Sequence, residues 1–184
     1  MHFAKLATGA ALVLLSTTIA FGQDNPRVGG AAMFADKNIV ENAVNSPDHT
    51  TLVAAVTAAG LVETLQGAGP FTVFAPVNAA FDKLPAGTVD TLLMPENKAQ
   101  LVKVLTAHVV AGKVSAADLL AGIAASSNGQ FNIHTVSGDT LIATARGKTV
   151  YIYDESGGAA RVTIADVNQS NGVIHVVDDV LLPK

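Results

Sequence analysis

The sequence contains no cysteine and no tryptophan, and it has few aromatic residues of any kind. Without cysteine there are no disulfides and no thiolate metal sites, so the folded chain must be stable by packing alone. Aromatic residues make up 5% of the chain, which argues against a platform on which sugars or bases stack. The formal net charge is -4 and no run of lysine or arginine occurs, so nucleic acid is not an expected partner.

The N-terminus has the pattern of an export signal. Lys5 precedes the mostly apolar segment 6–19, and small residues around Ala20 to Gly22 follow where a signal peptidase cuts. We expect residues 1–22 to be a cleaved signal peptide, which makes the protein periplasmic or extracellular. An uncleaved anchor is the alternative, but polar residues interrupt the segment, which is short for a membrane span of about 20 residues. We expect no membrane span after cleavage.

About 160 residues remain after the signal, enough for one domain. Residues 23–36 contain proline and glycine and are predicted to form an extended lead-in, followed by a single domain over residues 37–184. Capping residues and apolar spacing predict helices in the first part of this domain. They lie near residues 38–44, 51–59, 61–65, 88–93, 96–107 and 116–123.

Short β-branched segments separated by turn sequences follow the helices. They lie at residues 131–136, 141–144, 149–153, 161–167 and 173–180. One strand, Phe71 to Ala75, comes much earlier and is expected to pair with the late strands. Helices first and strands later indicate an α+β fold rather than a parallel βαβ array.

Two ordered blocks stand out in the sequence. The first is GPFTVFAPVNAAFDKLP, 69–85, and the second is NGVIHVVDDVLLP, 171–183. Together they resemble the two signature blocks of the fasciclin domain, and the similarity extends from about Val28 to Pro183. The positions of this chain that carry the motif are Phe71, Thr72, Phe74, Pro76, Asn78 and Phe81 in the first block, and Asn171, Gly172 and His175 in the second.

The resemblance implies a wedge of two β-sheets with helices packed around it. It also implies adhesion outside the cell, in most members without catalysis. An Asp-Ile pair tied to receptor binding in animal members falls on Asp166 and Val167. A Tyr-His pair falls on Ala107 and His108, so the aromatic partner is missing here. The absence of this tyrosine argues against receptor recognition of the animal type.

The candidate site residues also have structural interpretations. His108 lies on the apolar face of a predicted helix, where a neutral histidine that bonds a backbone carbonyl or Asn78 is favoured over a binding role. His175 lies between apolar strand residues and is also expected to be structural. Asp166 ends a predicted strand before a polar loop, so it is either a turn residue that bonds its own backbone or an exposed partner contact.

No pattern supports an enzyme, a cofactor or a metal site. The histidines are scattered without metal-ligand spacing, and no nucleophile motif occurs. Asp178 and Asp179 are adjacent in a predicted strand, so their carboxylates should point to opposite faces. They are therefore not expected to work as an acid and base pair.

We therefore expect a secreted, non-enzymatic adhesion or interaction module. Its partner would be a surface or matrix protein or a polysaccharide, and self-association would strengthen a single weak site. The alternative is a carrier of a small apolar ligand such as a carotenoid, held in a cleft left by small helical side chains. A glycan hydrolase would need two facing carboxylates, which the sequence does not identify.

Overall fold

The computed structural model describes residues 25–184. The expected signal peptide, residues 1–22, and the first two residues of the lead-in lie outside this range. Between residues 25 and 184, none of the helices combines the length and the apolar character that a bilayer crossing requires. The rest of the lead-in packs on the domain, since Val28 and Met33 are buried and the side chain of Asn25 bonds both backbone polar groups of Asn168.

A helical layer forms the first half of the domain. Asn38 begins the first helix with a reciprocal capping box to Glu41, and Gly60 ends the second helix in the left-handed conformation, as the sequence predicts. A 3₁₀ turn at Pro95–Asn97 replaces the start of the helix predicted at 96–107, because Pro95 opens a tighter turn. The helices are α1 (Ile39–Asn45), α2 (Thr50–Ala59), α3 (Val62–Gln66), α4 (Asn78–Phe81), α5 (Thr88–Leu93) and α6 (Lys98–Thr106).

Seven strands form one continuous order, β2-β1-β7-β6-β5-β4-β3. The early strand β1 lies between β2 and the last strand β7, and it runs parallel to β7, which confirms the predicted pairing of early and late strands. The strands are β1 (Phe71–Pro76), β2 (Val109–Ala111), β3 (Phe131–His134), β4 (Thr140–Arg146), β5 (Thr149–Tyr153), β6 (Ala159–Gln169) and β7 (Gly172–Val177). Strand β2 was not predicted, because three residues directly after a helix show no alternation.

The long strand β6 joins two halves of the sheet into a wedge. Its first residues, Ala159 to Arg161, pair with β5, and the remainder pairs with β7 through two register shifts. At the second shift Asp166 has a positive φ of 56°, unusual for a residue other than glycine. The strand continues to Gln169, so Asp166 does not end it as expected. The α+β wedge predicted from the sequence is confirmed.

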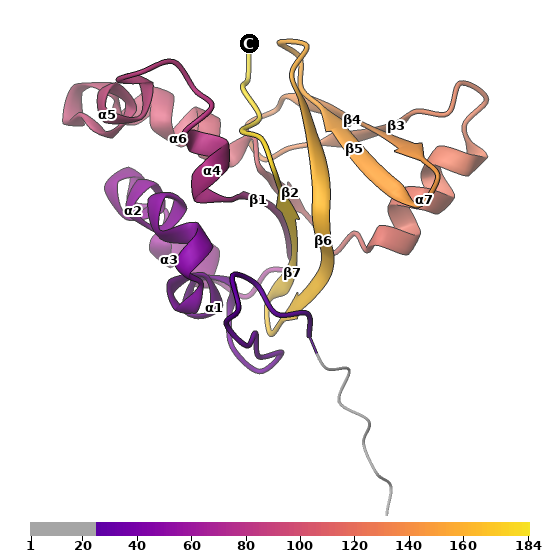
Figure 1. The fold of residues 1–184 in the computed structure, drawn as a ribbon, viewed down its shortest axis with the longest axis horizontal. Coiled ribbons are helices and arrows are strands. Elements are labelled where there is room, and N and C mark those ends of the chain that lie inside the picture. The colour runs from indigo at the N-terminus through magenta and orange to yellow at the C-terminus, as the bar shows by residue number, and fades with distance from the viewer. Residues whose placement is uncertain (1–24) are drawn as a thin grey trace, which may run out of the picture.

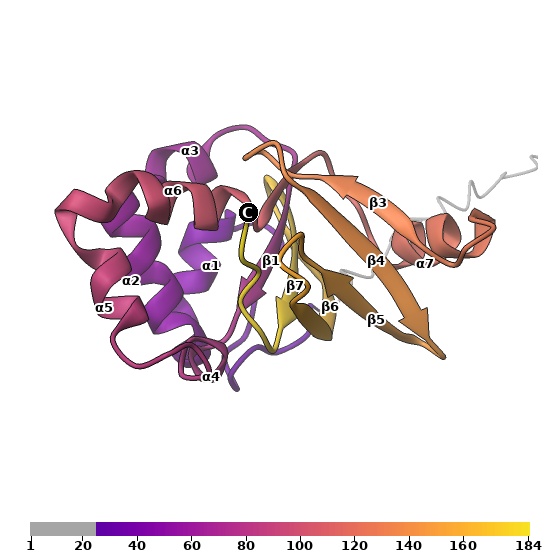
Figure 2. The same cartoon turned by 90° about the horizontal axis from the view of Figure 1, so that it is seen from above.

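The two halves of the sheet have helices on different sides. In Figures 1 and 2, α1 to α6 pack on the half formed by β1 and β7, while α7 (Ala116–Ala125) covers the far side of β3, β4 and β5. Ile174 and Val176 of β7 enter the core under the helical layer, whereas Phe74 and Val177 enter the core under α7. Strands β1 and β7 are therefore buried on both faces, which explains their continuous apolar sequence.

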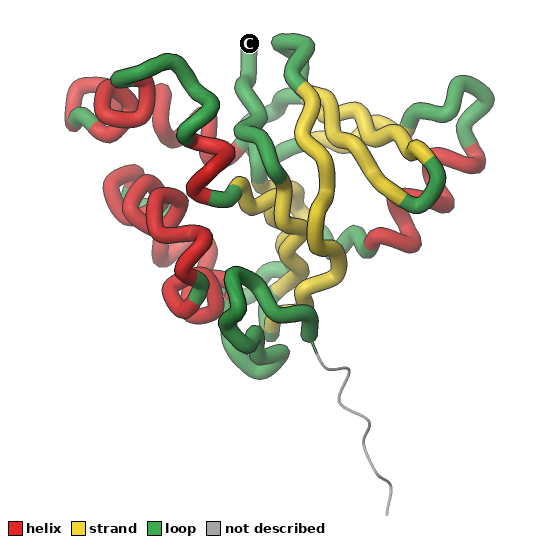
Figure 3. The backbone as a smooth tube through the Cα atoms, in the orientation of Figure 1, coloured by secondary structure: helices red, strands yellow, loops and turns green. Residues whose placement is uncertain are grey.

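The C-terminal residues leave the sheet earlier than expected. Strand β7 ends at Val177 rather than at residue 180, and the chain continues as a loop (Figure 3). The ladder ends because the carboxylate of Asp178, rather than a backbone carbonyl, accepts from the backbone N–H of Arg161 at 2.8 Å. Asp178 and Asp179 consequently lie outside the strand predicted to contain them.

Candidate functional site

The second signature block begins with a buried polar junction at Asn171. Its side-chain amide donates to the backbone oxygens of Leu65 and Gly67, at 2.7 and 2.9 Å, and its oxygen accepts from the backbone N–H of Ile39 at 3.1 Å. One side chain thereby joins the C-terminal end of α3 and the start of α1 to the β6–β7 turn. The next residue, Gly172, approaches β1 so closely that an added Cβ would lie 2.0 Å from the backbone oxygen of Phe71. The second block therefore packs directly against the backbone of the first.

Thr72 and Asn78 of the first block also bond the backbone. The hydroxyl of Thr72 donates to Gly112 at 2.7 Å and accepts from the N–H of Val114 at 2.8 Å. The side chain of Asn78 accepts from the N–H of Thr51 at 3.0 Å and donates to Pro47 at 2.9 Å.

Four further motif residues of the first block complete this framework. Phe71 is half-buried at the start of β1, and Phe74, Pro76 and Phe81 are buried. None of these side chains forms part of an accessible site.

His108 is buried and holds the C-terminal segment. One ring nitrogen, Nδ1, lies 2.8 Å from the backbone oxygen of Val104, and Nε2 accepts from the backbone N–H of Leu181 at 2.9 Å. A carbonyl oxygen needs a donor and an N–H needs an acceptor, so only the neutral ring satisfies both partners. Burial lowers the pKa of His108 to about 4. This arrangement confirms a carbonyl partner for the ring; Asn78, the other partner considered, bonds elsewhere.

His175 and Asp166 meet on β6 and β7. The backbone N–H of Asp166 donates to Nδ1 of His175 at 3.3 Å, and Nε2 of His175 lies 2.8 Å from the backbone oxygen of Val114. Burial lowers the pKa of this histidine, whose ring also stacks on Phe74 with 5.7 Å between ring centroids. The Asp166 carboxylate accepts from the backbone N–H of Ala116, in the first turn of α7, at 2.8 Å.

The three residues predicted to contact a partner therefore do not form a common exposed surface. His108 and Val167 are buried, and Asp166 is half-buried and bonded to α7. The polar loop expected after Asp166 is not fully exposed either, since Gln169 and Asn171 are buried. Partner binding through His108, Asp166 and Val167 stays a prediction.

A polar groove on the open face of β4, β5 and β6 is the more accessible candidate. Its volume is about 420 Å³, within the range of roughly 300–1,000 Å³ that is usual for ligand sites. It is formed by the sheet face that α7 does not cover, together with the loop after α4 and the segment after β7. Its lining residues, referred to below as the tyrosine–arginine groove, are Lys83, Arg146, Tyr151, Tyr153, Ala159, Arg161, Asp178 and Asp179.

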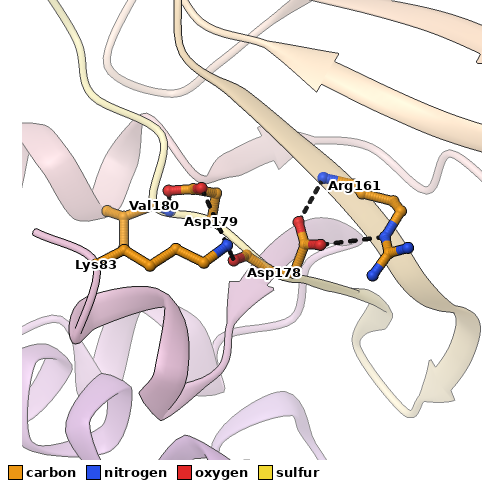
Figure 4. A network of polar contacts seen from close by, with 5 residues as sticks. All are labelled: Lys83, Arg161, Asp178, Asp179 and Val180. Carbon is orange, nitrogen blue, oxygen red and sulfur yellow. Dashed lines mark hydrogen bonds and ion pairs between the residues drawn. The ribbon is translucent and has the colours of Figure 1, made fainter.

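Two ion pairs form one wall of the groove. The Nε of Arg161 lies 3.1 Å from Asp178, and the Nζ of Lys83 lies 3.2 Å from Asp179. Lys83 also donates to the backbone oxygen of Asp178 at 2.5 Å. In Figure 4 the two cations approach the adjacent carboxylates from opposite sides. Each carboxylate is thus occupied by its own cation, and the two do not face each other across a shared space.

The other wall consists of an arginine over a tyrosine. The Arg146 guanidinium carbon lies 5.3 Å from the centre of the Tyr151 ring, within cation–π distance. Tyr151 is directly opposite Arg161 in the β5–β6 register, so a cationic side chain lies on each side of it. Tyr153 follows on the same face two residues later.

Sequence reasoning missed this groove, although part of its signal was present. The alternation of half-buried and buried residues in β5 places Tyr151 and Tyr153 on one face, and these are the two tyrosines of the chain. The positions of Arg161 and Lys83 beside them depend on strand register and on long-range packing. The low aromatic content of the chain suggested that no aromatic surface forms, but both tyrosines lie side by side in this groove.

A second, enclosed cavity lies between the helical layer and β1. It measures about 50 Å³, and its lining is almost entirely apolar. His49 lies at its wall with its ring bonded to Ser46 and to the backbone oxygen of Ala75, and burial lowers the pKa of this histidine. Over residues 25–184, the structure has no cluster of three or more histidine or carboxylate side chains that could hold a metal ion.

Comparisons with known proteins agree with the fold. The protein-family model for the fasciclin domain matches residues 47–183. Protein sll1483 of Synechocystis sp. is 49% identical over 156 residues, which cover 85% of this chain and 79% of that protein. The cell surface glycolipoprotein MPB83 of Mycobacterium bovis is 30% identical over 187 residues, which cover 98% of this chain and 76% of that protein.

The structure also resembles a FAS1 domain pair from the insect cell adhesion molecule fasciclin I. The TM-score is 0.69 at 18% sequence identity, and the match covers 79% of this chain. It covers 51% of the domain pair, so this chain spans about half of that structure. At this identity the likeness shows a common fold.

Proposed function

Because the chain belongs to the fasciclin domain family, we propose that it is an exported, non-enzymatic adhesion module that binds a partner in the cell envelope or extracellular matrix. The observation that carries this proposal is the family match over most of the domain, including both signature blocks. The export pattern of residues 1–22 supports a location outside the cytoplasm. A relative that aligns over nearly the whole chain bears the name of a cell surface glycolipoprotein, which favours the same location.

The chemistry of the tyrosine–arginine groove supports binding rather than catalysis. Asp178 and Asp179 are each paired with a cation, and buried His108 and His175 are each held neutral by one backbone carbonyl and one backbone N–H. A general acid and base need a carboxylate or histidine that is free to exchange a proton with a substrate. The tyrosine–arginine groove instead offers a stable polar surface.

A test of adhesion uses beads coated with residues 23–184, incubated with envelope and extracellular material from the producing cells. We expect saturable retention that soluble protein competes away and that beads coated with the unfolded chain do not show. Because one domain offers one weak site, retention should rise steeply with coating density. Equal retention by folded and unfolded coatings would contradict the proposal.

The carrier of a small apolar ligand is the second candidate, favoured by the apolar cavity between the helical layer and β1. That cavity measures about 50 Å³, far below the roughly 300–1,000 Å³ of usual ligand sites. A carotenoid would therefore require α1 to α3 to move away from the sheet. Visible absorption of the folded protein after incubation with a lipid extract tests this: pigment that co-purifies supports a carrier, and a colourless protein removes it.

A further inference from the structure

The tyrosine–arginine groove carries a positive charge that its own carboxylates do not balance. Three cationic side chains line it, Lys83, Arg146 and Arg161, against the two carboxylates of Asp178 and Asp179. Both ion pairs found in residues 25–184 lie in this groove, and neither includes Arg146. The chain as a whole has a formal net charge of -4, so this local excess of positive charge is opposite in sign to the rest of the molecule.

The arginine without a carboxylate partner lies over an aromatic ring. Arg146 extends from the end of β4 and places its guanidinium over the Tyr151 ring at 5.3 Å. A guanidinium stacked on an aromatic face still presents its N–H groups at its edge, in the fork that binds a carboxylate through two parallel hydrogen bonds. The groove therefore has a prepared site for one planar anion beside two tyrosines.

We propose that this groove binds an acidic polysaccharide through a uronate residue, whose carboxylate pairs with Arg146. The proposal rests on the adhesion function above and names the class of partner. A uronate residue combines a single carboxylate, several hydroxyl groups and an apolar C–H face. The groove offers a matching part for each: the Arg146 guanidinium, the paired carboxylates and Lys83 as hydrogen-bond partners, and the tyrosine rings as apolar surface.

This combination favours an acidic sugar over a nucleic acid. Asp178 and Asp179 can accept hydrogen bonds from sugar hydroxyls, whereas a phosphate backbone presents acceptors and further negative charge to them. Only three arginines occur in the chain, so the groove has few guanidinium groups with which to follow a longer phosphate backbone. A peptide carboxylate would use Arg146 but would lack the hydroxyl groups that the paired carboxylates can bind.

The experiment is a titration of isotope-labelled residues 23–184 with trigalacturonate, followed by backbone amide NMR shifts. We expect saturable shifts centred on Tyr151, Tyr153 and Arg161. The same trisaccharide with its carboxyls reduced to alcohols should bind about 10-fold more weakly or not at all, because it lacks the charge-assisted hydrogen bonds. Equal binding of the neutral trisaccharide would overturn the role of the carboxylate.

Substitutions of Arg146 test the site, and a substitution of Arg27 provides a matched control. Arg146→Gln should weaken trigalacturonate binding about 10-fold or more, and Arg146→Lys, which keeps the charge but loses the fork, should fall between it and the natural protein. Arg27→Gln removes the same charge at an exposed position outside the groove and should leave binding unchanged. Equal loss in Arg146→Gln and Arg27→Gln would overturn the site.

Two further outcomes decide against the proposal. Absence of shifts at millimolar trigalacturonate would exclude a uronate site, and a thymidine oligonucleotide of equal charge that bound as tightly would exclude sugar recognition. The bead assay tests adhesion independently of the groove. If beads retain matrix material but Arg146→Gln beads retain it equally, the groove assignment fails and the adhesion function stands.

Discussion

The fasciclin signature blocks and the tyrosine–arginine groove lie on one sheet but use their side chains in opposite ways. The motif side chains of the blocks fill two cores or bond backbone groups, and Asn171 alone joins three segments. Lys83, Asp178 and Asp179 also belong to the blocks but line the groove. Side chains of the groove point to solvent and bond one another in pairs. The blocks thus specify the framework, while the groove consists mostly of residues outside them.

This difference explains why family membership and partner identity are separate questions. A signature contains residues that the framework needs, and here seven of the nine motif residues are buried while Phe71 and Asn78 are half-buried. Residues on an open strand face can change without loss of the fold, because their side chains contribute little to the core. The two regions should therefore respond differently to substitution.

The largest effect is expected where the first block fills the core under α7. Phe74 is fully buried, so Phe74→Ala should lower the free energy of unfolding by about 4 kcal/mol through the cavity that it leaves. Phe34 is 50% exposed, and Phe34→Ala should cost far less. Urea denaturation at neutral pH measures both. Similar losses would show that burial does not separate framework from surface in this chain.

The second effect concerns pH and His108. Because burial lowers the pKa of this histidine from 6.5 to about 4, the unfolded chain takes up a proton first as the pH falls. The stability that neutral His108 contributes is complete above pH 6.5 and is lost as the pH falls toward about 4. Protonation linked to His108 alone should therefore lower the free energy of unfolding by about 3 kcal/mol between pH 6.5 and about 4.

Denaturation near neutral pH and near pH 4 in two variants tests this assignment. His108→Gln should reduce the pH dependence but not abolish it, because burial also lowers the pKa of His49 and His175. His134→Gln, at an exposed strand position, should retain the full dependence. Gln can still accept the hydrogen bond from Leu181 but does not titrate. An unchanged slope in His108→Gln would assign the acid sensitivity to other groups.

Asp166 belongs to neither region; it is half-buried, and its substitution should have an intermediate effect. Asp166→Ala removes the acceptor for the Ala116 N–H and places alanine at a φ of 56°. We expect a loss of about 1–2 kcal/mol, from one hydrogen bond and an unfavourable backbone conformation. Asp166→Asn keeps an acceptor and tolerates this conformation, so its melting temperature should stay close to that of the natural protein. An equally unstable Asn variant would require another explanation.

Much of the framework could be predicted because its signals are local. Asn38, Gly60 and Ser115 bound helices through caps that the sequence displays, and these boundaries are confirmed. Strand β2 could not be predicted, since Val109 to Ala111 become a strand only by pairing with β1. Strand β7 ends at Val177 for a similar reason, because Asp178 bonds a residue of β6.

The groove could not be predicted either, because it too depends on contacts between residues far apart in the sequence. Period-2 alternation places Tyr151 and Tyr153 on one face of a strand, but it does not show what lies opposite them. Arg161 reaches Tyr151 through the β5–β6 register, and Lys83 reaches Asp179 across 96 residues of chain. The sequence does identify Asp166 as a special position, although its helix-bonding role depends on where α7 packs.

The smallest change in stability is expected for Arg146→Gln. Arg146 is exposed, and its contact with Tyr151 is the only interaction of its guanidinium found in residues 25–184. Its loss should lower the free energy of unfolding by about 0.5 kcal/mol, as for an exposed cation–π pair. Arg27→Gln, measured by the same urea denaturation, sets the baseline for removing one exposed arginine. A loss well above 1 kcal/mol would mean that the groove also supports the framework, and a reduction in binding by this variant could then no longer be assigned to the lost guanidinium alone.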